Sequence, residues 1–183
     1  MKRNSSLILA IVLLIVVGSV FRVIGFAPQL AMAVFGAVVI KDKRLAFSIP
    51  LLSMFLSDVL FEILYRNGYV AYGGFYEGQI INYLLIAGIT LMSFWARNKN
   101  WAGILATTII APSIYFLFSN LFTWLGGGGY NRPKTFNGLI MCYNDAVPFF
   151  RSGLINAIIF SAILFGGYYL LLKFVVRQNQ LTN

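Results

Sequence analysis

Long apolar runs separated by short polar stretches make up almost the whole chain. Residues 46–65, AFSIPLLSMFLSDVLFEILY, form one such run, with about the 20 residues that a helix needs to cross a lipid bilayer. Six runs follow one another, at residues 7–26, 28–40, 46–65, 79–95, 101–125 and 151–175. The pattern predicts an all-α integral membrane protein, in which a bundle of six transmembrane helices forms a single domain over residues 1–183.

Two of the six runs allow a second interpretation. Residues 28–40 would rise only about 20 Å as a helix, so this segment either crosses a locally thinned bilayer or enters it only in part. Residues 7–17 have the length of a signal-peptide core. No clean Ala-x-Ala cleavage site follows them, so we expect a first transmembrane helix that is retained.

Basic residues are distributed unevenly among the loops. If the N-terminus is cytoplasmic and all six runs cross, nine of the 14 Lys and Arg residues fall on the cytoplasmic side. These nine are Lys2, Arg3, Lys41, Lys43, Arg44, Arg97, Lys99, Lys173 and Arg177. Cytoplasmic loops of membrane proteins carry such an excess of Lys and Arg. We therefore expect both termini in the cytoplasm, and a multi-pass protein embedded in the lipid bilayer of the bacterial inner membrane.

The composition excludes several kinds of chemistry. Hydrophobic residues make up 60% of the chain and charged residues 10%, which is too much apolar surface for a soluble domain of this size. The basic residues stand singly or in small groups between apolar runs, so we expect no nucleic acid as a partner. There is no His and only one Cys, Cys142, which removes His-based triads, zinc motifs and an internal disulfide. We expect no cofactor and no bound metal.

Polar residues inside the runs gather at one depth. Asp58 and Glu62 are four residues apart near the outer end of their run, so on a helix they share a face. An acid within a bilayer costs roughly 2.5 to 3.5 kcal/mol unless it faces protein or water, and three asparagines lie in the outer third of other runs. This arrangement predicts an outward-facing ligand pocket, with residues 126–150 as a loop that closes over it. The predicted ligand-binding residues are Asp58, Glu62, Asn82, Asn120, Trp124, Tyr143, Arg151 and Asn156.

These polar groups also have a simpler interpretation. Asparagines join transmembrane helices through hydrogen bonds worth about 0.6 kcal/mol each, and Asp58 could pair internally with Arg22 or Arg151. Hydrogen bonds that only join helices can lie at any depth in the bilayer, whereas the polar groups of a binding site lie together at one depth. We therefore favour ligand binding for the set as a whole and keep internal pairing as the alternative.

Small residues mark one face of the second run. Ala33, Gly36 and Ala37 have the small-xxx-small spacing that lets another helix approach closely. This face suits packing against a helix of the same chain, and it also suits the docking of another membrane subunit. Both possibilities stay open.

Four segments carry distinctive motifs: PQLAMAVFGA at residues 28–37, AFSIPLLSMFLSD at 46–58, FSNLFTWL at 118–125 and GLIMCYNDAVPFFR at 138–151. Together they resemble an uncharacterised family of bacterial multi-pass membrane proteins, over roughly residues 22–166. Gly25, Phe26 and Ala27 stand where that family usually has Asn, Phe and Thr before Pro28, and Asn156 stands where it often has Asp. The resemblance implies a membrane protein and no particular activity.

A looser similarity is to the substrate-binding S-components of energy-coupling-factor transporters. The shared features are six crossings, cytoplasmic termini, an outward pocket and an Ala-xxx-Ala motif, although that motif lies in the first helix of S-components and in the second run here. The similarity implies a subunit that binds or transports a small molecule of unknown identity.

Two other functions are weighed against transport. A structural or accessory subunit of a larger membrane complex would use the Ala33 and Ala37 face to hold its partners. An enzyme would need its acid and base to face each other across a cleft, whereas Asp58 and Glu62 lie on adjacent turns of one predicted helix. We therefore expect no enzymatic activity.

Overall fold

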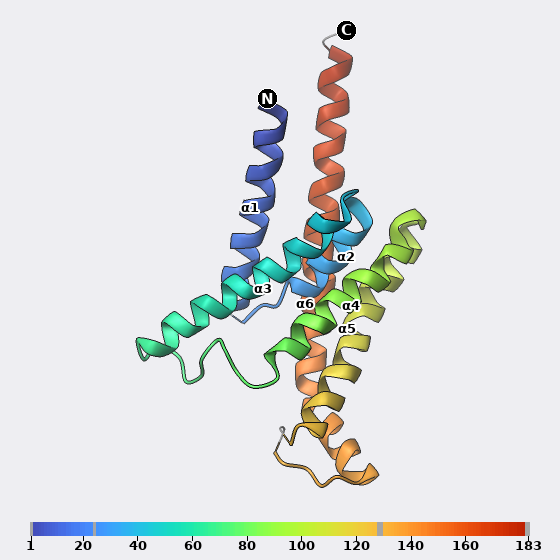
Figure 1. The fold of residues 1–183 in the computed structure, drawn as a ribbon. Helices are drawn as coiled ribbons and strands as arrows, with labels where there is room; N and C mark the ends of the chain where they lie inside the picture. Colours follow the sequence, from blue (N-terminus) through green and yellow to red (C-terminus); the bar gives the residue numbers. More distant parts are fainter. Residues whose placement is uncertain (1, 24, 128–129, 182–183) are drawn as a thin grey trace.

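The protein is described by a computed structural model, which covers the backbone of residues 2–23, 25–127 and 130–181 and the side chains of residues 11–23, 25–127 and 130–173. Within these ranges the chain forms six α-helices, one 3₁₀-helix and no β-strand (Figure 1). The elements are α1 (Lys2–Val23), α2 (Gln29–Val39), α3 (Lys43–Arg66), α4 (Gln79–Ser93), η1 (Phe94–Asn98), α5 (Trp101–Leu125) and α6 (Phe136–Leu181). The prediction of an all-helical fold is confirmed for the described residues.

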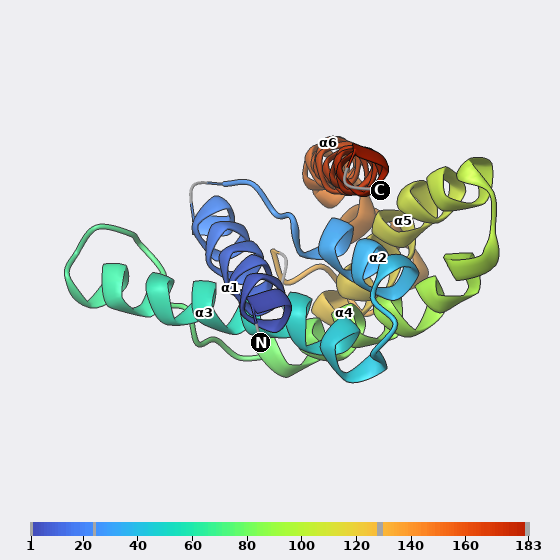
Figure 2. The same cartoon turned by 90° about the horizontal axis from the view of Figure 1, so that it is seen from above.

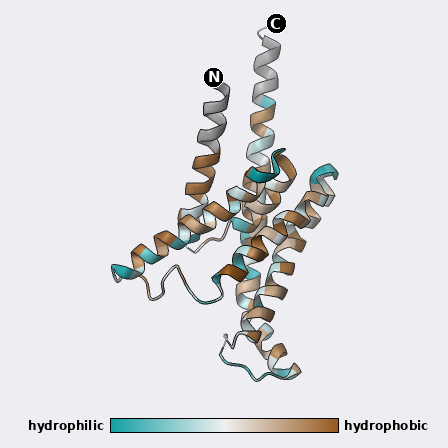
Figure 3. Cartoon of the chain, in the orientation of Figure 1, coloured by the Kyte–Doolittle hydropathy of each residue, from teal (hydrophilic) through white to brown (hydrophobic). Residues whose placement is uncertain are grey.

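Four stretches of helix are long and apolar enough to cross a membrane. They are Lys43–Arg66, Gln79–Asn98, Trp101–Leu125 and Phe136–Lys173, whereas Ile11–Val23 and Gln29–Val39 are apolar but shorter. Hydrophilic residues concentrate where α3 begins and ends and at the turn between η1 and α5, while apolar residues dominate along the helices (Figure 3). These features indicate a membrane protein, and the count of six crossings stays a prediction.

The short helix α2 lies at the centre of the fold. Figure 2 shows it among α3, α4, α5 and α6, and α1 lies across α3 and contacts α2 through the hydrogen bond from Gln29 Nε2 to the Gly18 carbonyl oxygen. Of its residues, Gln29, Leu30, Ala31, Met32, Ala33, Val34, Gly36 and Ala37 are buried. A helix that is apolar on all sides belongs in an interior, and the sequence QLAMAVFGAVV has that character. Its 11 residues rise only about 16 Å, so neighbouring helices cover most of this segment.

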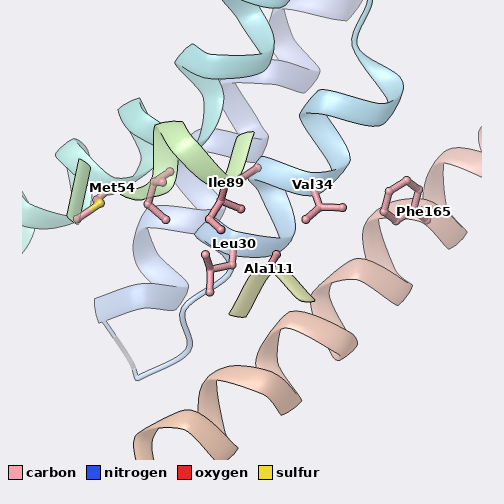
Figure 4. Packing of buried hydrophobic residues seen from close by; sticks show 8 residues of the cluster. Leu30, Val34, Met54, Ile89, Ala111 and Phe165 are labelled. Carbon is pink, nitrogen blue, oxygen red and sulfur yellow. The ribbon is translucent and has the colours of Figure 1, made fainter. Parts of the chain in front are cut away.

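The hydrophobic core is built around α2. Leu30 and Val34 pack with Met54 of α3, Ile89 of α4 and Phe165 of α6, and Ala111 of α5 completes the contact (Figure 4). Each of these buried side chains removes apolar surface from solvent or lipid and adds dispersion contacts. The core therefore joins five helices, and the start of α4 and the end of α1 both meet α3 at Asp58.

The small residues of α2 contact helices of the same chain. An added Cβ on Gly36 would lie 3.1 Å from the Ala46 carbonyl oxygen of α3, and Ala33 and Ala37 are completely buried. Ala46 is four residues before Pro50, whose missing N–H leaves this carbonyl without a helical donor, so a glycine allows close packing at that point. Helices of this chain therefore cover the face formed by Ala33, Gly36 and Ala37, and it is not available for another subunit in this conformation.

The end of α2 is fixed by η1. Arg97 Nε donates to the Ala37 carbonyl oxygen at 2.8 Å, and Arg97 Nη2 donates to the Ile40 carbonyl oxygen. The last carbonyl groups of a helix have no intrahelical donor, and a cation there also complements the helix dipole. The Arg97 guanidinium in addition lies 4.8 Å from the centre of the Phe94 ring.

The largest difference from the sequence prediction lies in residues 126–150, which we expected to be a loop over the pocket. Helix α6 begins at Phe136, so the connection is limited to residues 126–135. Thr135 Oγ1 accepts a hydrogen bond from the Gly138 N–H at 3.1 Å, which is the arrangement of an N-cap. Pro148 lies inside this helix and not in the predicted loop.

Candidate ligand site

Asp58 lies where the end of α1 crosses α3. Its Oδ1 atom forms an ion pair with Arg22 Nη1, and the same nitrogen lies 2.6 Å from Ser57 Oγ. Asp58 is completely buried, while a fifth of the Arg22 side chain is exposed. Because an unpaired buried charge is costly, the pairing explains how an acid is tolerated here. Of the two internal partners considered for Asp58, Arg22 and Arg151, the structure pairs it with Arg22.

The first two turns of α4 complete the surroundings of Asp58. Its Oδ2 atom accepts a hydrogen bond from Gln79 Nε2 at 2.5 Å and another from Tyr83 Oη at 2.6 Å. Gln79 and Tyr83 are four residues apart and therefore lie on one face of the helix. With Arg22, they give the Asp58 carboxylate three donors from two helices, so its buried oxygen atoms have partners.

The connection of residues 67–78 returns across α3 beside this ion pair. An added Cβ on Gly74 would lie 1.7 Å from the Asp58 carbonyl oxygen, so the backbone packs directly on the helix at this glycine. Glu62 accepts a hydrogen bond from Arg66 Nε at 2.8 Å, and an added Cβ on Gly73 would lie 2.8 Å from its Oε2 atom. Glu62 therefore lies against this loop.

A small cavity of about 310 Å³ opens beside the ion pair. Its walls are Arg22, Asp58, Phe61, Tyr72, Gly73, Gly74 and Tyr76. The connection of residues 67–78 thus supplies one side of the cavity, and α1 and α3 supply the other. Glu62 itself does not line it.

A larger cavity of about 580 Å³ lies between the start of α4 and the end of α5. Tyr76, Glu77, Gly78, Ile81, Asn82, Ser119, Phe122, Thr123, Gly126 and Gly127 line it. Asn82 Nδ2 donates to Tyr76 Oη at 2.6 Å, and Asn82 Oδ1 accepts from Tyr115 Oη at 2.9 Å. Tyr76 contributes to both cavities, so the two lie side by side.

Trp124 and Arg132 hold the connection of residues 126–135. Trp124 Nε1 donates to the Pro133 carbonyl oxygen at 2.9 Å, and Lys134 Nζ lies 5.1 Å from the Trp124 ring centre. Arg132 forms a two-bonded ion pair with Asp145 of α6, at 2.8 and 3.0 Å. Hydrogen bonding to that carboxylate raises the pKa of Arg132 above its ordinary value. Trp124 therefore acts on the loop and does not line either cavity.

The other predicted ligand-binding residues lie away from both cavities. Asn120 Nδ2 donates within its own helix to the Phe116 carbonyl oxygen at 2.8 Å, and Tyr143 Oη donates across to the Leu117 carbonyl oxygen at 2.8 Å. Tyr143 thus joins α6 to α5. Asn156 is buried, Arg151 is exposed, and neither forms a side-chain hydrogen bond with the described residues. Of the predicted set, the structure brings only Asp58 and Asn82 to the neighbouring cavities.

Several residues of the site are absent from the predicted set, among them Gln79, Tyr83, Tyr76 and Gly74. The spacing of Gln79 and Tyr83 at the start of a helix was the one available signal, because it places an amide and a phenol on a single face. The parts played by Tyr76 and Gly74 depend on how the loop folds back, and no local pattern reveals that.

Fold and site together define a class of protein: an all-helical membrane protein with a buried ion pair and two adjoining polar cavities at one end of its helices. The chain belongs to the family of unknown function DUF6580, whose family model matches residues 2–180. No curated protein and no solved structure matches the chain.

Proposed function

We infer that the protein is a small-molecule-binding subunit of a membrane transport system in the bacterial inner membrane. The ligand site is the cavity of about 580 Å³ beside Asn82. Small-molecule sites have volumes of about 300 to 1,000 Å³ and combine apolar walls with a few polar groups. The cavity therefore suits a metabolite of vitamin size.

The lining residues narrow the chemical class of the ligand. Asn82, Ser119 and Thr123 offer hydrogen bonds, Glu77 offers a negative charge, and Phe122 offers an apolar wall. Hydroxyl or amino groups on a partly apolar body match this combination, because each buried polar group of a ligand needs a partner. The cavity beside Asn82 is the single observation on which the function rests.

The proposed orientation places the two cavities outside the cytoplasm. The start of α1 and the end of α6 lie at the same end of the molecule, away from the connections of residues 67–78 and 126–135 (Figure 1). The greater number of Lys and Arg residues falls on the side of the termini, which supports six crossings with the termini cytoplasmic.

Cysteine labelling tests this orientation. In a Cys142→Ser background, Phe136→Cys should react with a membrane-impermeant maleimide in intact spheroplasts, because Phe136 is exposed at the start of α6. Lys41→Cys, in the turn between α2 and α3, should react only after lysis. The opposite pattern would place the cavities on the cytoplasmic side and contradict uptake from outside.

Ligand binding is tested by the thermal unfolding midpoint of the detergent-purified protein across a panel of vitamins and metabolites. A compound at about 100 times its Kd adds about 2.7 kcal/mol to the free energy of unfolding, so a true ligand should raise the midpoint clearly. Thr123→Val removes a lining hydroxyl at nearly constant volume and should weaken that compound by about tenfold, equivalent to about 1.4 kcal/mol.

Thr107→Val is the matched control for this experiment. Thr107 lies on the same helix, donates to the Gly103 carbonyl oxygen at 2.8 Å and lines neither cavity, so binding should be unchanged. The proposal fails if no compound in the panel raises the midpoint, or if both valine variants weaken binding equally.

A further inference from the structure

The cavity beside Arg22 and Asp58 has a chemistry of its own, which follows from counting hydrogen bonds. The Asp58 carboxylate already accepts from Arg22, Gln79 and Tyr83. Both of its oxygen atoms are occupied, so it has little capacity left for a ligand. Its role is to hold Arg22 in place.

Arg22, in contrast, has N–H groups that form no hydrogen bond with the described residues. A guanidinium carries five N–H donors in a planar fork, and every hydrogen bond of Arg22 to the described residues comes from Nη1, to Ser57, Asp58 and the Met54 carbonyl. The groups on Nε and Nη2 have no acceptor among those residues. A fifth of this side chain is exposed and it lines the cavity, so the unused donors are what an incoming group can reach.

The charge balance around Arg22 favours a monoanion over a more highly charged group. Asp58 already neutralises one positive charge, and a second acid, Glu62, is paired with Arg66. A dianion would meet repulsion from Asp58, whereas a carboxylate matches the free edge of a guanidinium in both geometry and charge. Phe61, with its ring centre 5.6 Å from the Arg22 guanidinium carbon, and Tyr72 offer aromatic walls for the atoms that carry the carboxylate.

We propose that the Arg22 cavity is a carboxylate subsite for the ligand whose hydroxyl- or amine-bearing part occupies the cavity beside Asn82. Tyr76 lies in the walls of both cavities, so one molecule can extend past it. This inference rests on the proposed function and narrows it: the substrate class is a small carboxylic acid that also carries hydroxyl or amino groups.

The test uses two probes of nearly equal shape, 4-fluorophenylacetate and 4-fluorophenylacetamide, observed by ¹⁹F NMR. The protein is held in nanodiscs of phosphatidylcholine, which has no carboxylate of its own, and empty nanodiscs give the background from partitioning. The acetate should show saturable line broadening with the wild-type protein, and the amide should bind at least tenfold more weakly, because only the acetate presents an anion to Arg22.

Two variants separate binding at Arg22 from general effects. Arg22→Gln alone leaves Asp58 unpaired, so the double variant Arg22→Gln with Asp58→Asn is used, which keeps the site neutral and similar in shape. It should lose the preference for the acetate. Arg151→Gln removes an exposed arginine that lines neither cavity, and it should retain the preference.

Equal broadening by the two probes, absence of broadening by either, or an unchanged preference in the double variant would overturn the subsite. These outcomes are independent of the metabolite panel. If the panel yields a ligand that depends on Thr123 but whose affinity is the same in the double variant, the proposed function stands and the carboxylate subsite falls. If the panel yields no ligand but the acetate still binds through Arg22, the proposed function fails and the anion site remains.

Discussion

Asp58→Ala should lower the free energy of unfolding by about 3 to 5 kcal/mol, the usual cost of removing one partner from a buried ion pair. Asp58 is completely buried, and its loss would leave Arg22, Gln79 and Tyr83 without their common acceptor. Arg22 would then be a charge without a partner at the junction of α1 and α3. We expect these helices to separate first, since this network and Ser19 provide their polar contacts.

The thermal unfolding midpoint in detergent measures this effect. The double variant Arg22→Gln with Asp58→Asn should regain much of the lost stability, because it leaves no unpaired charge. Glu77→Ala is the control, since it removes an acid that forms no ion pair within the described part of the chain. A midpoint for Asp58→Ala equal to that of Glu77→Ala would show that the ion pair contributes nothing to the fold.

Gly74→Ala should detach the connection of residues 67–78 from α3. The added Cβ would lie 1.7 Å from the Asp58 carbonyl oxygen and 3.0 Å from its Cα atom, and backbone cannot move aside as a side chain can. Overpacking of this kind costs about 1 to 3 kcal/mol. The released loop would no longer form its side of the cavity beside Arg22.

Chymotrypsin cleavage of the loop measures this release, because Tyr69, Tyr72, Phe75 and Tyr76 lie within it. Gly73→Ala is the matched control: its Cβ would meet the Glu62 Oε2 atom at 2.8 Å, and the end of a flexible side chain can shift. We expect rapid cleavage of the Gly74 variant and slow cleavage of the wild type and of the Gly73 variant. Equal rates for the two alanine variants would refute close packing at Gly74.

Hydrophobic length predicted most of the helices. The apolar runs at residues 46–65 and 101–125 correspond to α3 and α5 within a few residues, because about 20 consecutive apolar residues favour a helix in lipid. The beginning of α6 was missed. Residues 126–150 were expected to form a loop, whereas the Thr135 cap and the ion pair of Asp145 with Arg132 stabilise a helix from Phe136 onward.

The candidate site was predicted in outline only. Asp58 and Asn82 stood out because a polar side chain in a membrane-spanning run is costly unless it faces protein or water. Both lie at the neighbouring cavities. Glu62 stood out for the same reason and instead pairs with Arg66 beside the loop. A sequence pattern shows that burying a carboxylate is costly, but it does not show which donors will pair with it. Gln79 and Gly74 meet α3 only because the connection of residues 67–78 folds back on that helix.

The central position of α2 has a consequence for biosynthesis. The helix is among the first segments to leave the ribosome, yet the residues that enclose it include Ala111 and Phe165, which are synthesised much later. The core cluster that contains Leu30 and Val34 is complete only when α5 and α6 have joined the assembly. Membrane insertion and completion of the core are therefore separate events, and the nascent chain must hold an incompletely covered α2 between them.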